Sequence, residues 1–353
     1  MTGKKDIFEY QYLNMIVDLR SDTVTKPSPG MLEAMMKAKV GDDVFEEDET
    51  VTALEQKAAG IFGMEAGLFC PSGTMTNQIA IKSLTQPMDE LIVDDTAHVY
   101  RSEGGGIAFN SGASVRLLHG DRGRINPGLI EPHINPENVH LPKTSLVVIE
   151  NTVNFGGGSY YTLNQIESIS HLCKLKNLYL HLDGARVFNA LTETGDQSRK
   201  YGHFFNTISV CLSKGLGAPV GSVMLGSKDL VKKARRIRKV LGGGMRQAGF
   251  MAAAGIYALD NNIKRLKEDH THAKVIAEAL TGQSYVKSMM PVDTNIIIFE
   301  LTDHCKASDF ISKLNDSGIK CLEFGRQKIR FVTHLDIRSE MVDHTIDTLR
   351  HFK

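Results

Sequence analysis

Short apolar runs that alternate with helix-like segments are the feature of this sequence that most constrains its fold. The predicted strands are residues 68–70, 90–93, 145–149, 178–182 and 208–212. Because these runs are largely apolar, they are typical of a parallel sheet that helices cover on both faces. Helical spacing at 165–175 and 228–241 supplies such covering segments. We therefore predict an α/β fold with a mainly parallel sheet.

The sequence changes in character near residue 260, which predicts a second domain. The expected elements of this part are a helix at 262–280, strands at 295–300 and 329–332, and helices at 307–315 and 340–352. A chain of 353 residues has room for about two domains. We assign 15–260 to a large domain, 261–353 to a small C-terminal α+β domain and 1–14 to an N-terminal extension.

The composition of the chain limits which classes of binding partner and which cellular compartment are expected. Lys plus Arg number 41 and Asp plus Glu number 41, so the net charge is zero. Proteins that bind nucleic acids or membrane surfaces usually carry a basic excess, and no apolar run reaches the roughly 18 residues of a membrane-spanning helix. The five cysteines form no C-x-x-C pair, and the N-terminus lacks the apolar core of a signal peptide. We expect a cytoplasmic protein with no nucleic-acid or membrane partner.

Two charged residues follow predicted strands that lie about one strand–helix–strand unit apart. Asp183 comes directly after 178–182, and Lys214 follows 208–212 within a run of small residues. Each has two interpretations: Asp183 is a helix cap or a ligand, and Lys214 is a surface charge or a buried amine that can form a Schiff base. Ligands of parallel sheets sit at the carboxyl ends of strands, and an amine beside a carboxylate is what pyridoxal phosphate (PLP) needs.

Polar residues also follow two other predicted strands. Ser72, Gly73 and Thr74 come after 68–70 and open a helix, so they either cap it or bind a cofactor phosphate. His98 comes after 90–93 and is either structural or a group that stacks on a cofactor ring or acts as a base; His140 has the same alternatives. Because His and Cys show no regular spacing, no metal site is predicted.

Two further patterns are not assigned a function. Gly215-x-Gly217-x-x-Val220 approaches the dinucleotide-binding fingerprint, but it lacks the third small residue and the acidic residue about 20 positions later. The basic run at 232–239 lies in one predicted helix of a neutral protein, without interleaved aromatic residues. We expect this helix to be solvated or to face another subunit rather than nucleic acid.

Eight short motifs occur in a fixed order along the chain. They are D-L-R-S-D-T-V-T at 18–25, G-D-D-V at 41–44, P-S-G-T-M at 71–75, E-N-T at 150–152, D-G-A-R at 183–186, S-K-G-L at 213–216, G-G-G-M-R-Q-A-G at 242–249 and R-x-V-T-H at 330–334. Together they resemble the low-specificity L-threonine aldolases, which are PLP enzymes of the aspartate-aminotransferase fold (fold type I). The likeness runs from about Met15, a candidate start of the chain, to the C-terminus.

The resemblance implies how the cofactor would be held. Lys214 would bind PLP as a Schiff base, Asp183 would pair with the ring nitrogen, and His98 would stack on the ring. The phosphate would lie on Ser72, Gly73 and Thr74, and Arg186, Arg246 and Lys239 would also bind the cofactor.

The resemblance also implies how the substrate would be held. Ser21, Arg186 and Arg330 would bind its carboxylate, a role that suits the planar guanidinium. Arg246 and Lys239 would reach the site of a neighbouring subunit in a homotetramer.

The implied reaction is retro-aldol cleavage of L-threonine, L-allo-threonine and related β-hydroxy-α-amino acids to glycine and an aldehyde. His98 or His140, directly or through water, would take the β-hydroxyl proton. The alternatives are another PLP reaction on this fold, such as β-elimination, racemisation or transamination; a non-catalytic protein on the same scaffold; and a nicotinamide oxidoreductase.

Departures from the family pattern fall near the expected pocket. Family members often carry an aromatic residue where this chain has Ser102, a His in place of Val153, and V-Y-G-E-D where it reads V-F-E-E-D at 44–48. A small hydroxyl at 102 and an apolar residue at 153 predict weak threo/erythro discrimination and acceptance of bulky β-substituents.

Overall fold

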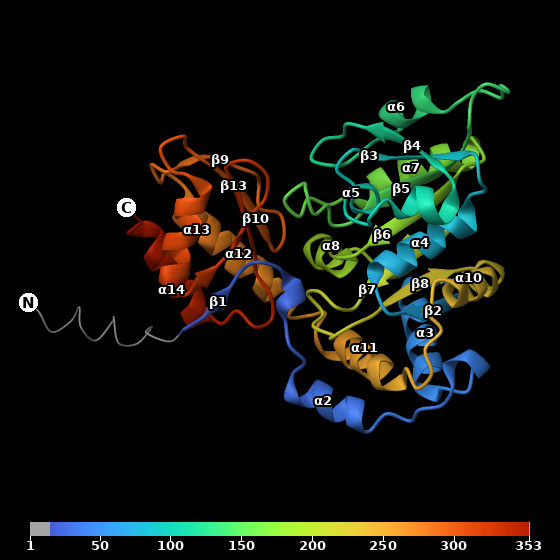
Figure 1. The fold of residues 1–353 in the computed structure, drawn as a ribbon, viewed down its shortest axis with the longest axis horizontal. Coiled ribbons are helices and arrows are strands. Elements are labelled where there is room, and N and C mark those ends of the chain that lie inside the picture. The colour runs from blue at the N-terminus through green and yellow to red at the C-terminus, as the bar shows by residue number, and fades with distance from the viewer. Residues whose placement is uncertain (1–14, 353) are drawn as a thin grey trace, which may run out of the picture.

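The computed structural model describes residues 15–352, so the predicted extension at 1–14 lies outside the described residues. This part of the chain forms two lobes, each built on its own sheet (Figure 1). The larger lobe holds a seven-stranded sheet, and the smaller holds a four-stranded one. The predicted class, an α/β fold with a smaller C-terminal α+β part, is confirmed.

The large sheet is mainly parallel, and its strand order is β2-β8-β7-β6-β5-β3-β4. Its strands are β2 (Ala66–Cys70), β3 (Asp89–Asp94), β4 (Ser114–Leu118), β5 (Lys143–Glu150), β6 (Tyr179–Gly184), β7 (Thr207–Cys211) and β8 (Ser222–Gly226). Only β8 runs against its neighbours. All five predicted strands are present, whereas β4 and β8 were missed. As a result, the carboxyl ends of six strands share one edge of the sheet.

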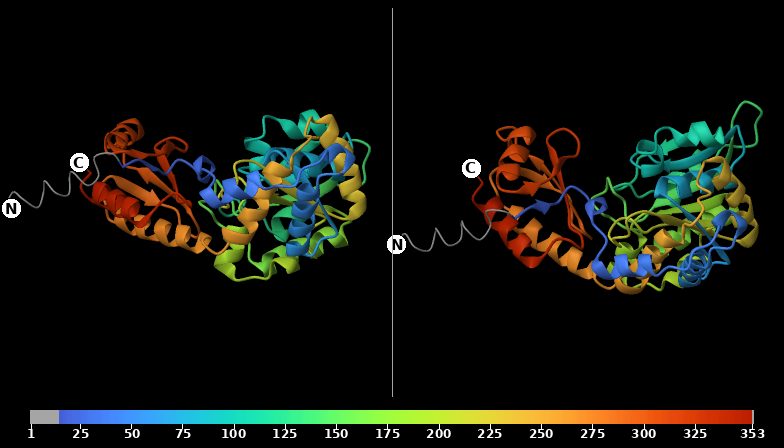
Figure 2. Two further views of the ribbon diagram at one scale, coloured as in Figure 1. Left: turned by 90° about the horizontal axis from the view of Figure 1, so that it is seen from below. Right: turned by 60° about the horizontal axis from the view of Figure 1, so that its bottom comes forward.

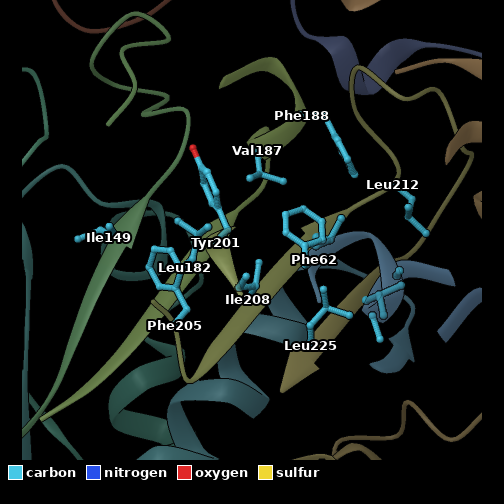
Figure 3. Packing of buried hydrophobic residues seen from close by; sticks show 14 of the residues in the cluster. Phe62, Ile149, Leu182, Val187, Phe188, Tyr201, Phe205, Ile208, Leu212 and Leu225 are labelled. Atoms are coloured by element: carbon cyan, nitrogen blue, oxygen red, sulfur yellow. The ribbon is translucent and has the colours of Figure 1, made fainter. Parts of the chain in front are cut away.

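Helices cover both faces of this sheet, as its apolar strands require. Apolar residues of α4 (Gly73–Leu84) and α10 (Lys228–Val240) pack on one face. The other face carries α3 (Glu49–Phe62), α7 (Leu163–Leu175), α8 (Val187–Thr194) and α11 (Gly249–Asn261). Figure 3 shows this second interface, where Phe62 lies with Leu182, Ile208 and Leu225 of three strands. The remaining helices of this lobe are α2 (Pro29–Met36), α5 (His98–Arg101), α6 (Pro127–Ile130) and α9 (Ser198–Tyr201).

The small lobe is an antiparallel sheet covered by helices. Its strand order is β12-β13-β10-β9, with bounds β9 (Val286–Met289), β10 (Ile296–Leu301), β12 (Leu322–Glu323) and β13 (Lys328–Val332). The helices are α12 (Leu266–Leu280), α13 (Ala307–Asp316) and α14 (Ser339–Arg350). Phe299, Phe310 and Phe331 form edge-to-face ring pairs in its core. Between residues 15 and 352, every helix is too short or too polar to cross a membrane.

The N-terminal segment belongs to the small lobe, so the predicted large domain at 15–260 is wrong at its start. β1 (Val17–Asp18) pairs in parallel with β11 (Ile319–Lys320), and Val17 and Leu19 are buried in the small-lobe core. Figure 2 shows this segment, in blue, crossing from the small lobe to the large one. A two-residue strand has no periodicity to read in the sequence, which explains the error.

The basic helix α10 is also anchored more firmly than predicted. The Arg238 side chain is 2% exposed; its Nη2 lies 2.7 Å from Asp43 Oδ2, and its Nη1 donates to the Phe69 carbonyl at 2.7 Å. Arg235 of the same helix pairs with Glu55 at 3.1 Å. The prediction of a solvated or subunit-facing helix is therefore wrong for this face, because the G-D-D-V motif supplies a buried carboxylate to α10.

We expect Arg238→Met to lower the free energy of unfolding by about 3–5 kcal/mol, because it leaves Asp43 buried without its cation. Arg236→Met is the matched control, since Arg236 is exposed on the same helix. Urea unfolding of both variants measures the difference. Equal stability of the two variants would contradict this role of Arg238.

Candidate active site

Residues from four strand ends meet at the carboxyl edge of the large sheet. A cavity of about 140 Å³ there is lined by Gly73 and Thr74 after β2, His98 after β3, Asp183 in β6 and Lys214 after β7. The structure thus brings together these five predicted residues, which are spread over most of the large lobe.

The turn that carries Lys214 depends on Gly217. The Gly217 N–H donates to the Lys214 carbonyl at 2.8 Å, and Gly217 has φ +76°, a conformation that favours glycine. A Cβ at this position would lie 2.3 Å from the Leu335 side chain. Among the described residues, the Lys214 amine takes part in none of the ion pairs, and it faces the cavity that Asp183 also lines. The S-K-G-L motif therefore presents an amine at the sheet edge.

The N-terminus of α4 offers an anion site on the same cavity. Ser72 caps the helix by accepting from the Met75 N–H at 3.2 Å. The N–H groups of Gly73 and Thr74 begin the helix and find no acceptor in the part of the chain that the structure describes. Two free N–H groups at the positive end of a helix suit a phosphate.

A buried hydrogen-bond network joins Asp183 to His98. Asn77 Nδ2 donates to Asp183 Oδ2 and to Glu103 Oε1, each at 2.9 Å. His98 Nδ1 lies 3.0 Å from the same Glu103 oxygen and 4.0 Å from Asp183 Oδ2. Sequence reasoning gave neither Asn77 nor Glu103 a role. The spacing of Asn77, one helical turn after Gly73, could have indicated it, whereas nothing in the sequence points to Glu103.

This cluster is better suited to an organic cofactor than to a metal ion. His98, Glu103 and Asp183 each offer one nitrogen or oxygen atom of the kind that binds metal ions. These three atoms lie within 4.8 Å of one another, a spacing that a cation could use. Asn77 Nδ2, however, donates into both carboxylates and places N–H groups between them. A cation there would oppose those N–H dipoles.

Charges around the cavity shift two pKa values. Burial lowers the pKa of His98, but the hydrogen bond to Glu103 and the charge of Asp183 outweigh it, so the pKa lies above its ordinary value. Burial, together with the charge of Asp183, raises the pKa of Glu150 to about 7. Glu150 accepts from the backbone N–H groups of His98 at 3.1 Å and Asn154 at 2.9 Å. It thereby ties the His98 segment to the loop after β5.

Two buried arginines meet beside this cavity. Arg186 Nε and Nη2 donate to Asp22 at 2.8 and 2.6 Å, which leaves Nη1 for a ligand. Arg330, on β13 of the small lobe, donates to Asn154 Oδ1 at 3.1 Å, and its Nε has no partner in the described chain. Burial, and then the charge of Arg186, lower the pKa of Arg330 to about 10. A carboxylate placed here would relieve the excess positive charge. 

Ser21 directly precedes Asp22, the carboxylate partner of Arg186. The carbonyl of its neighbour Arg20 accepts from Arg330 Nη2 at 3.0 Å. The Ser21 hydroxyl accepts from the Thr23 hydroxyl at 2.8 Å, so its own proton is free for a ligand. The three residues predicted to hold a carboxylate are therefore close together.

His140 is not brought to this site within its own chain. It is exposed in the loop that leads into Lys143, the first residue of β5, and so lies at the amino edge of the sheet, opposite Asp183 and Lys214. This loop forms the green projection beyond α6 in Figure 1. The prediction that His140 serves as a base is wrong for its own subunit, since residues before a parallel strand face away from the ligand edge.

Four other predicted residues also lie outside the cavity. The Arg246 side chain is 55% exposed and pairs with Asp42 at 2.8 Å, and Lys239 is exposed nearby. Ser102 is exposed and does not line the cavity. Val153 is 1% exposed in the hydrophobic core, so the expectation that it borders the substrate is wrong. The weak discrimination predicted from Ser102 and Val153 thus loses its basis.

Comparison with known proteins agrees with this geometry. The family model described as β-eliminating lyase matches residues 18–304. The low specificity L-threonine aldolase of Escherichia coli K12 is 40% identical over 336 residues, which cover 93% of this chain and 96% of that protein. The probable low-specificity L-threonine aldolase 2 of Arabidopsis thaliana is 39% identical over 337 residues, covering 94% and 95%.

Solved structures show the same fold at lower identity. The threonine aldolase of Leishmania major superposes with a TM-score of 0.82 at 21% identity, covering 95% of this chain and 98% of that one. Because the family model spans most of the chain and the relatives match nearly all of it, the chain belongs to the β-eliminating lyase family and, within it, to the low-specificity L-threonine aldolases.

Proposed function

We propose that this protein is a PLP-dependent aldehyde-lyase that cleaves L-threonine, L-allo-threonine and related β-hydroxy-α-amino acids to glycine and an aldehyde. The observation that carries the proposal is the meeting of the Lys214 amine and the Asp183 carboxylate in one cavity. The paired arginines beside it supply the site for an amino-acid carboxylate. The relatives' names agree with this chemistry.

The residues present fit PLP. Lys214 would carry it, Asp183 would meet the ring nitrogen, and His98 would lie against the ring, while the free N–H groups of Gly73 and Thr74 would bind its phosphate. When bound, PLP supplies the electron sink that accepts the electron pair of the broken Cα–Cβ bond.

The chain itself orients the substrate and moves one proton. Arg186 Nη1, Arg330 and the Ser21 hydroxyl hold the carboxylate and thereby set the direction of the Cα–Cβ bond. His98, directly or through a water, takes the proton from the β-hydroxyl as the aldehyde leaves. Of the two predicted bases, His98 is the one on the cavity, and His140 is available only to another subunit.

We also propose a homotetramer whose sites are shared between subunits. Arg246 and Lys239 point out from the chain and do not line its own cavity. Phe45 and Val240, which are 70% and 83% exposed, lie in the adjoining segments. Apolar side chains exposed beside charged ones are typical of a subunit interface. The five cysteines all carry free thiols, which supports the cytoplasm as the location.

The wild-type enzyme should release acetaldehyde and glycine in equal amounts from L-threonine and L-allo-threonine, without added keto acid. An aldehyde-coupled assay and amino-acid analysis measure both products, and Lys214→Ala serves as the inactive control. Release of ammonia and a keto acid would indicate β-elimination instead. A strict requirement for an added keto acid would indicate transamination.

Asp183→Asn should lower kcat/KM by about 10²-fold or more, because the amide keeps the Asn77 contact but loses the charge that holds a protonated ring nitrogen. Asp94→Asn is the matched control. Asp94 ends β3 on the same edge, and its side chain accepts from Thr96 and the Gly120 N–H and from no other described residue. Steady-state kinetics compare the two variants. Similar losses in both would refute the assigned role.

Mixing inactive Lys214→Ala with inactive Arg246→Ala protein should restore part of the activity, because hybrid oligomers regain complete sites. Subunit exchange is verified by native mass spectrometry of the mixture. If hybrids form and no activity returns, each site is built within one chain.

A further inference from the structure

We propose that Glu103 is a positioning residue that fixes the tautomer of His98: it accepts the Nδ1 proton and leaves Nε2 as the basic nitrogen on the cavity. This inference rests on the proposed function, in which His98 takes the β-hydroxyl proton. His98 lines the cavity and is 25% exposed, whereas the Glu103 side chain is fully buried. Glu103 therefore acts on the substrate only through His98.

The surroundings of Glu103 require it to be an acceptor. Oε1 accepts from Asn77 Nδ2 at 2.9 Å and lies 3.0 Å from His98 Nδ1, while Oε2 accepts from Gln78 Nε2 at 2.7 Å. The orientation of the Asn77 amide is fixed, because its Nδ2 faces two carboxylates and only a donor fits there. Both oxygens of the Glu103 carboxylate already accept one hydrogen bond, and the His98 Nδ1–H is the third donor that it faces.

Asp183 does not compete for this role. Its Oδ2 lies 4.0 Å from His98 Nδ1 and accepts from Asn77, and its Oδ1 accepts from the Ala185 N–H at 3.1 Å. Asn77 thus lies between two buried carboxylates, of which Asp183 lines the cavity and Glu103 lies behind His98. One orients the histidine, and the other remains for the cofactor.

The charges that face His98 predict how its titration responds. Glu103, Asp183 and Glu150 favour the protonated ring, and burial and Lys214 oppose it. Removal of the Glu103 charge therefore lowers the pKa of His98. Because only neutral His98 accepts a proton, kcat/KM rises with pH through this pKa, and the rise should lie at lower pH in a Glu103 variant.

The test compares Glu103→Gln with Gln78→Leu in the PLP-loaded enzyme. Gln78→Leu removes the hydrogen bond to Glu103 Oε2 but leaves the contact between Oε1 and His98 intact. It therefore measures the effect of losing a hydrogen bond to Glu103 that does not involve His98. Deuterium exchange at the His98 Cε1–H, followed by peptide mass spectrometry across pH, gives the His98 midpoint without using activity.

We expect the midpoint of Glu103→Gln to fall below that of wild type, with Gln78→Leu unchanged. Activity should follow: kcat of Glu103→Gln drops by about 10-fold or more, with KM little altered. Equal His98 midpoints in wild type and Glu103→Gln, or an unchanged kcat, would overturn the role of Glu103. A wild-type enzyme that releases no aldehyde would instead overturn the proposed function, a result distinct from the exchange measurement.

Discussion

Parallel pairing of the central strands decides where the chemically active groups of the large lobe lie. β3, β5, β6 and β7 run in one direction, and β2 joins them because β8 between it and β7 is reversed. Each of these strands ends at the same edge, and the ends of β2, β3, β6 and β7 contribute residues to one cavity. An amine, a carboxylate, an imidazole and a helix N-terminus thus meet although they come from separate parts of the sequence.

A buried ion pair connects this edge to the small lobe. Asp22 follows β1, which pairs with the small lobe, and its carboxylate binds Arg186, two residues after the end of β6. Arg330 reaches the same place from β13. A substrate carboxylate held between the two arginines would contact both lobes at once. Losing either partner of the Asp22–Arg186 pair would leave the other buried and unpaired, which is costly.

Strands and helices with a regular pattern of apolar residues could be predicted from the sequence, and so could the functional residues at the ends of those strands. Strands apolar on both faces were found, and with them Asp183, Lys214 and His98, because a parallel sheet fixes the functional edge. His140 was misplaced although the same rule applies, since it precedes β5 instead of following it.

Buried polar pairing could not be predicted. Arg238 with Asp43 and Arg186 with Asp22 are contacts between segments far apart in the sequence, and no local pattern encodes them. Glu103 and His98 are five residues apart, but their contact depends on the path of the chain after α5. The two-residue β1 and the core position of Val153 could not be predicted either, because tertiary packing determines both. The resemblance to a family identified residues at the site without showing which side chains orient them.

Reduction with borohydride followed by peptide mass mapping tests the central claim most directly, because it fixes PLP covalently to the amine that holds it. We predict a single pyridoxyl adduct on Lys214, the lysine at the carboxyl edge beside Asp183. An adduct on another lysine, or no adduct on protein loaded with PLP, would contradict the account.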